Sequence, residues 1–109
     1  MKAIVSIILS LFVASAMSVR AADAKANWDA NCVQCHGKDG HADTKMGKTL
    51  NAKDLTDPKV QAAFTDAKAT QSIKEGVKDN GKTTMKAFGS KLSDDEVKAL
   101  VAYVRTLKK

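Results

Sequence analysis

Cysteine, proline and aromatic residues are scarce in this sequence. Among its 109 residues are two cysteines, one proline, one tryptophan, one tyrosine and three phenylalanines. Two cysteines cannot supply the four ligands of a structural zinc site. No strand–helix–strand pattern lies near them, as a thiol–disulfide redox motif would require. With so few large apolar residues, a domain of this length buries only a marginal core unless another group is built into it.

The patterns of common enzymes and of β-sheets are missing as well. There is no nucleophile–base pair, no phosphate-binding loop and no paired acid site, so the polypeptide itself predicts neither hydrolysis nor group transfer. No strand pattern, internal repeat or low-complexity segment is visible. The sequence therefore predicts one small all-α domain that is not an enzyme.

The charge balance is only mildly basic. The full chain has 18 basic and 12 acidic residues, a net charge of +6. Residues 1–21 hold two of the basic residues and no acidic one, which leaves 16 basic against 12 acidic, or +4, in residues 22–109. Charge alone therefore does not indicate a nucleic-acid-binding protein.

Residues 1–21 have the pattern of a secretory signal peptide. Lys2 is followed by an apolar run from Ala3 to Val13 and then by small residues. This run is too short to predict a membrane span, although an uncleaved N-terminal anchor is the alternative. Cleavage after Ala21, with Ala16 and Ala24 as other candidate sites, predicts an exported, periplasmic domain at 22–109 with no membrane span of its own.

One stretch organises the rest of the chain: Cys32-Val33-Gln34-Cys35-His36. Two cysteines three positions apart, followed directly by histidine, are the signature of covalent c-type haem attachment. Each thiol adds to one porphyrin vinyl group, and the histidine then lies where its imidazole can bind the iron. The motif predicts one haem held by Cys32 and Cys35, with His36 as the proximal ligand. Such a group would also complete the small core.

Four helices are predicted from capping residues and from apolar residues that recur every three or four positions. They cover residues 24–35, a short stretch opening at Pro58, residues 66–77 and residues 94–107. In the third, Ile73 and Val77 continue one apolar stripe. The last begins with a capping box, in which Ser93 and Glu96 each bond the other's backbone. Residues 37–57 and 78–91 are predicted to be loops, the second with a tight turn at Asn80-Gly81.

The sixth iron ligand has three candidates. Met85 lies 49 residues after His36, far enough for the chain to reach the opposite haem face. Met46 follows His36 by only 10 residues, in a lysine-rich loop, and is more typical of a packing residue. His41 would give a bis-histidine site, but it follows too soon to cross the porphyrin, so we interpret it as a solvated loop residue. The sequence favours Met85.

Over residues 24–109 the chain resembles the small single-haem cytochromes c of mitochondria and bacteria. The resemblance rests on Trp28 four positions before the first cysteine, on the haem motif, on the loop Thr84-Met85-Lys86-Ala87-Phe88-Gly89 and on the final helix. It implies a fold in which the first and last helices cross, Trp28 packs against Leu100 and Tyr103, and shorter helices and loops wrap one haem. It also implies that a backbone carbonyl of residues 47–50 holds the His36 ring.

The predicted function is one-electron transfer by a soluble, monomeric periplasmic carrier with His/Met ligation. Four lysines flank the loops that should border the haem: Lys45, Lys48, Lys82 and Lys86. Their positive charge would steer acidic redox partners, although ordinary solvation is an equally good explanation for these residues. The alternatives are a haem enzyme or gas sensor with an open sixth site, and a cytochrome subunit of a larger redox complex.

Overall fold

The computed structural model describes residues 21–109, so the predicted signal peptide lies outside the described residues except for Ala21. The elements follow one another along the chain as α1 (Ala21–Asn31), α2 (Val33–His36), α3 (Lys45–Thr49), α4 (Pro58–Ala62), α5 (Asp66–Glu75), β1 (Val77–Asp79), β2 (Lys82–Met85) and α6 (Asp94–Thr106). Within this range no helix has the length and apolar character needed to cross a membrane.

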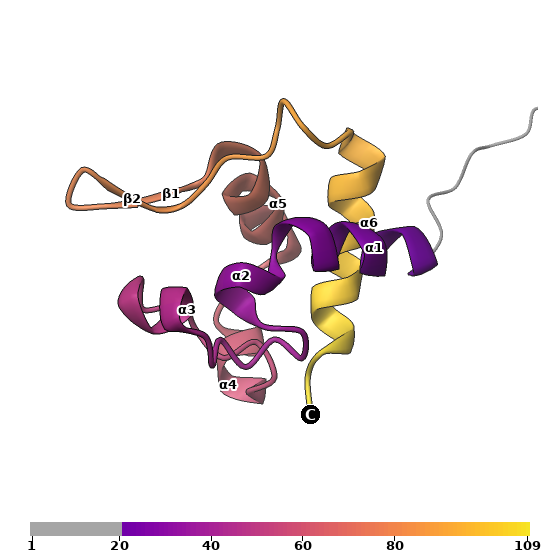
Figure 1. The fold of residues 1–109 in the computed structure, drawn as a ribbon. Helices are drawn as coiled ribbons and strands as arrows, with labels where there is room; N and C mark the ends of the chain where they lie inside the picture. The colour runs from indigo at the N-terminus through magenta and orange to yellow at the C-terminus, as the bar shows by residue number, and fades with distance from the viewer. Residues whose placement is uncertain (1–20) are drawn as a thin grey trace, which may run out of the picture.

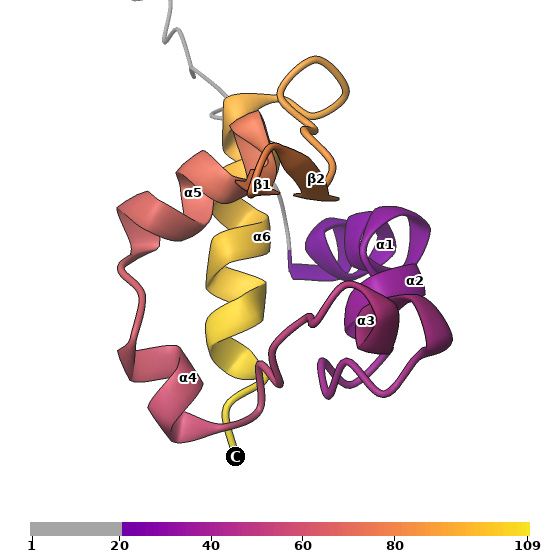
Figure 2. The same cartoon turned by 90° about the vertical axis from the view of Figure 1, so that its left-hand side faces the viewer.

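Helix α6 is the centre of the arrangement. Figure 2 shows α4 and α5 on one side of it and α1, α2 and α3 on the other. In Figure 1, α1 crosses α6. The predicted capping box starts α6: the Ser93 hydroxyl accepts from the Glu96 N–H at 3.1 Å, and Glu96 Oε1 accepts from the Ser93 N–H at 3.0 Å.

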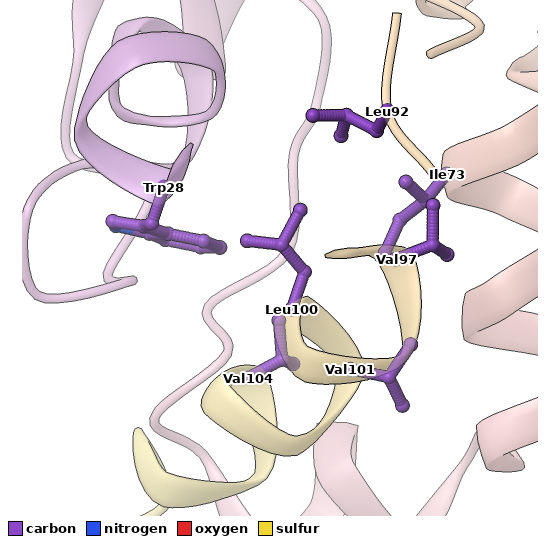
Figure 3. Close-up of a cluster of buried hydrophobic side chains, with 7 residues drawn as sticks. All are labelled: Trp28, Ile73, Leu92, Val97, Leu100, Val101 and Val104. Atoms are coloured by element: carbon purple, nitrogen blue, oxygen red, sulfur yellow. The ribbon is translucent and has the colours of Figure 1, made fainter. Parts of the chain in front are cut away.

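The core lies where α6 meets α1 and α5. Trp28, on α1, is 2% exposed and points toward Leu100 of α6 (Figure 3). The Trp28 and Tyr103 ring centroids are 5.5 Å apart. The predicted docking of the first and last helices through these residues is confirmed. Ile73 joins the cluster from α5, and the other buried members are Leu92, Val97, Val101 and Val104.

Arg105 ties α6 to the chain between α4 and α5. Its guanidinium donates to the Gln61 carbonyl at 2.6 Å and to the Phe64 carbonyl at 2.9 Å, and its Nε lies 2.8 Å from Asp66 Oδ1. The same group stacks over the Phe64 ring at 4.3 Å from the centroid. Planar, five-donor arginine suits this position because lysine cannot make so many directed bonds.

The short helices begin where the sequence provides caps. Asp57 accepts from the Lys59 N–H and precedes Pro58 at the first position of α4, as predicted. Thr65 caps α5 in the same way, and Gly37 ends α2 with a φ of 79°. The first predicted helix, 24–35, is divided between α1 and α2, with Cys32 between them.

The all-α prediction is wrong at residues 77–85, where β1 and β2 form an antiparallel hairpin. Asn80 and Gly81, at φ 51° and 77°, form the predicted tight turn, and positive φ at both positions suits a two-residue hairpin. Both strands are exposed along most of their length, so no alternating apolar pattern marks them. Val77 is therefore an exposed strand residue, and α5 ends before it.

Residues 45–49 were predicted to be loop but form helix α3. Thr44 caps it by accepting from the Gly47 N–H at 2.9 Å. The helix has no apolar stripe of its own because it is only five residues long and carries two lysines. Packing against α2, rather than an amphipathic pattern, accounts for it.

Candidate functional site

A cavity of about 640 Å³ opens beside α2, a size typical of cofactor sites. It is lined by residues 30–32 and 34–36 around α2, by Met46 and Leu50 at α3, by residues 83–85 of β2 and by the segment that follows β2. In Figure 1, α3 and the hairpin both extend to the left of α2, away from α6. All four predicted site residues, Cys32, Cys35, His36 and Met85, line this one cavity.

A single helical turn positions the haem motif. The N–H groups of Cys35 and His36 donate to the Cys32 carbonyl at 3.3 Å and 2.9 Å. Residues three positions apart in a helix lie on the same face, so both sulfurs face the cavity side of α2. Both cysteines are partly buried, and they are not joined by a disulfide. Burial, followed by the neighbouring Cys35, raises the pKa of the Cys32 thiol to about 11.

His36 fits the role of a metal ligand. Burial lowers its pKa, which favours the neutral imidazole that binds iron. Its ring lies against Trp28, with centroids 5.6 Å apart. Its Nδ1 is buried and has no hydrogen-bond partner among the described residues. A neutral imidazole that directly follows two thiols, at a cavity of this size, matches the residues that a covalently attached haem requires.

The predicted bond from the His36 ring to a carbonyl of residues 47–50 is not made at Nδ1. In the structure, Gly47 and Lys48 direct their carbonyls to the N–H groups of Ala52 and Asn51, at 2.9 Å and 3.4 Å. These bonds belong to α3 and the turn that ends it. Because this stretch is helical rather than a loop, the carbonyls of Gly47 and Lys48 are used locally.

One wall of the cavity consists of α2 with α3 packed on it. The Thr44 hydroxyl donates to the Cys35 carbonyl at 3.0 Å. Gly47 approaches this carbonyl so closely that a Cβ at position 47 would overlap its oxygen. Met46, on α3, therefore belongs to the same wall as His36, and it is 41% exposed.

The other wall is β2 and the segment that follows it. Met85 is the last residue of β2, and its side chain is partly buried, as is Phe88. This wall is attached to α5 by two backbone bonds, one of which runs from the Phe88 N–H to the Ile73 carbonyl at 2.8 Å. Met85 and His36 thus reach the cavity from separately supported walls, whereas Met46 and His36 share one.

His41 does not line the cavity; it lies in a loop, as predicted, but it is only partly exposed and makes several polar contacts. Its Nδ1 lies 3.2 Å from both Asp54 Oδ2 and the Thr56 hydroxyl, and its Nε2 lies 3.3 Å from the Lys109 ammonium. Hydrogen bonds from Thr56, and then His41, lower the pKa of Asp54. The residue therefore connects the loop to the C-terminus, a contact that depends on long-range folding and leaves no local pattern.

Comparison with known proteins identifies related domains. The family model for subunit III of cbb3-type cytochrome c oxidase matches residues 19–104. A solved structure named KustC0563 c-type cytochrome is 36% identical, with a TM-score of 0.70, and the match covers 79% of this chain and 98% of that one. A mutant of that protein matches at 36% identity and a TM-score of 0.68, covering 79% and 99%. No curated protein sequence matches significantly.

Proposed function

Because the chain belongs to the family of small c-type cytochromes, we propose that it is a soluble periplasmic electron carrier whose haem iron lies between His36 and Met85. Proteins of this family bind haem c covalently, and the cofactor supplies the one-electron redox chemistry. In this chain Cys32 and Cys35 are the residues that would form the two thioethers. The observation that carries the proposal is the placement of His36 and Met85 on different walls of one cavity.

The polypeptide's part is to hold both ligands and exclude competing ones. His36 is fixed by packing against Trp28 and by the turn of α2, and it stays neutral because burial lowers its pKa. The Met85 thioether is a soft ligand that favours ferrous iron and so raises the reduction potential. Leu50 and Phe88 line the cavity with apolar surface, which keeps water away. With both side chains held in place, gain or loss of an electron by the bound haem would need little rearrangement of the protein.

Two methionine variants test the ligation. Met85→Ala should abolish the weak far-red absorption of iron–methionine bonding in the oxidised protein, lower the reduction potential and open the iron to carbon monoxide. Met46→Ala is the matched control, since Met46 also lines the cavity but from the wall of His36. It should leave all three properties unchanged. The opposite result would assign the sixth ligand to Met46.

The partner is proposed to be a redox protein with an acidic surface. Lys86 lines the cavity, and the side chains of Lys45, Lys82 and Lys86 are exposed. Lys48 is exposed too, but it pairs with Asp43 at 3.0 Å and so contributes less positive field. Positive charge at the rim of a redox site accelerates association with negatively charged partners.

A second candidate function is that of a subunit in a larger redox complex. The observation that favours it is the family match, because the matching model describes subunit III of an oxidase. When the membranes and the soluble fraction of the native source are separated, a free carrier should be recovered in the soluble fraction, as a monomer. Recovery mainly with a membrane oxidase would favour the subunit.

A further inference from the structure

The C-terminal end of α5 holds the segment that follows Met85. The last carbonyls of a helix have no partner inside it and must find one elsewhere. Here the Ile73 carbonyl accepts from the Phe88 N–H at 2.8 Å, and the Lys74 carbonyl accepts from the Gly89 N–H at 3.0 Å. Ile73 is itself buried in the core beside α6. The segment after β2 is therefore in fixed register with a helix that cannot shift easily.

Gly76 is where the two backbones come closest. It caps α5 with φ 76° and ψ 179°, a region that is open essentially to glycine alone. A Cβ built at position 76 would lie 2.6 Å from the Met85 carbonyl oxygen and 3.0 Å from the Ala87 nitrogen. Both atoms belong to the backbone, so a small side-chain movement cannot relieve the overlap. Any other residue would push the Met85 segment off the end of α5.

The strand pairing of the hairpin between Gly76 and Met85 is irregular. Val77 pairs with Met85 while Lys78 pairs with Thr83, so the pairing shifts by one residue. Thr84 is the extra residue, and its hydroxyl donates to the Val77 carbonyl at 3.3 Å. A β-bulge of this kind redirects the side chain next to it. Met85 is therefore paired with Val77, the residue that directly follows Gly76.

We propose that Gly76 is a positioning residue for the sixth iron ligand. It allows the Met85 backbone to pack directly against the end of α5, so the Met85 side chain enters the cavity from a backbone that is held rigidly. The inference rests on the proposed function, since it takes Met85 to be the ligand. It predicts that the iron–methionine bond depends on a glycine that does not line the cavity.

The test compares Gly76→Ala with Gly81→Ala in the haem-loaded protein. Gly81 also has a positive φ, at 77°, and lies at the turn of the adjoining hairpin, but a Cβ there has no neighbour within 4 Å. We expect Gly76→Ala to lose at least half of the far-red band, to have a lower reduction potential and to bind carbon monoxide when reduced. Gly81→Ala should match the unmutated protein in all three. Equal spectra for the two variants would overturn the inference.

A second pair separates positioning from lost stability. Gly89→Ala has no positive φ to strain, but its Cβ would lie 2.8 Å from the Lys74 carbonyl oxygen, so it should weaken the band even if Gly76→Ala does not fold. Gly40→Ala, with φ 83° and a Cβ 2.8 Å from Leu107 Cδ1, destabilises a region away from the cavity and should leave the band intact.

The two proposals fail in different ways. If the unmutated protein lacks the far-red band, Met85 ligation is wrong and the inference fails with it. If the band is present and survives in Gly76→Ala, or in Gly89→Ala where Gly76→Ala does not fold, only the positioning role of the α5 end is overturned.

Discussion

Replacing Trp28 with alanine should destabilise the haem-loaded protein by about 4 kcal/mol, within the range for a fully buried large aromatic residue. The indole is 2% exposed and lies between α1 and α6, with the Tyr103 and His36 rings at 5.5 Å and 5.6 Å. About 1 kcal/mol of the loss belongs to the hydrogen bond from its Nε1 to a backbone carbonyl. That bond reaches the Gly37 carbonyl at 3.1 Å.

Denaturant unfolding of the oxidised protein measures this loss. Trp28→Phe keeps an aromatic ring but removes the bond to Gly37, so it should cost roughly 1–2 kcal/mol. Lys25→Ala, on the same helix and exposed, is the control and should leave the midpoint unchanged. A loss below about 1 kcal/mol for Trp28→Ala would refute the docking of α1 on α6, because surface substitutions have effects of that size.

Three further results are expected. Arg105→Lys should cost about 2 kcal/mol in the same assay, since directed bonds to two backbone carbonyls are lost; an unchanged midpoint would show that these bonds are not needed. The hydrogen bond from the Ser93 N–H, and then the one from Asn27, keeps the pKa of Glu96 below its usual 4.5. The stability that Glu96 contributes should therefore be complete above pH 4.5 and be lost as the pH falls through the folded pKa. Glu96→Gln should reduce this acid-induced loss of stability. Association with an acidic redox partner should slow with added salt and with Lys82→Glu plus Lys86→Glu, and rates insensitive to both would indicate ordinary solvation.

Local chemistry determines how much of the site the sequence could predict. The Cys32-to-His36 motif needs only one helical turn to assemble, so its spacing alone indicated the cofactor. The caps at Asp57 and Ser93 and the turn at Asn80-Gly81 are equally local. These features depend on residues within four positions of one another, so the sequence alone is enough to predict them.

The features that sequence reasoning missed depend on long-range contacts. Helix α3 exists because Gly47 fits against the Cys35 carbonyl, and His41 is held by Thr56 and Lys109. The hairpin has too few buried residues to give an alternating pattern. Gly76 carried one available signal, a glycine at the end of a helical stripe, but its approach to Met85 required the folded structure.

Carbon monoxide binding to the reduced, unmutated protein reveals whether the sixth position of the iron is occupied. With His36 and the Met85 thioether as its ligands, the iron would have both axial positions filled. The spectrum of the reduced protein should then stay unchanged when carbon monoxide is added at neutral pH. Rapid formation of a carbon monoxide complex would contradict the account, because it would show an open sixth site and favour a haem enzyme or gas sensor.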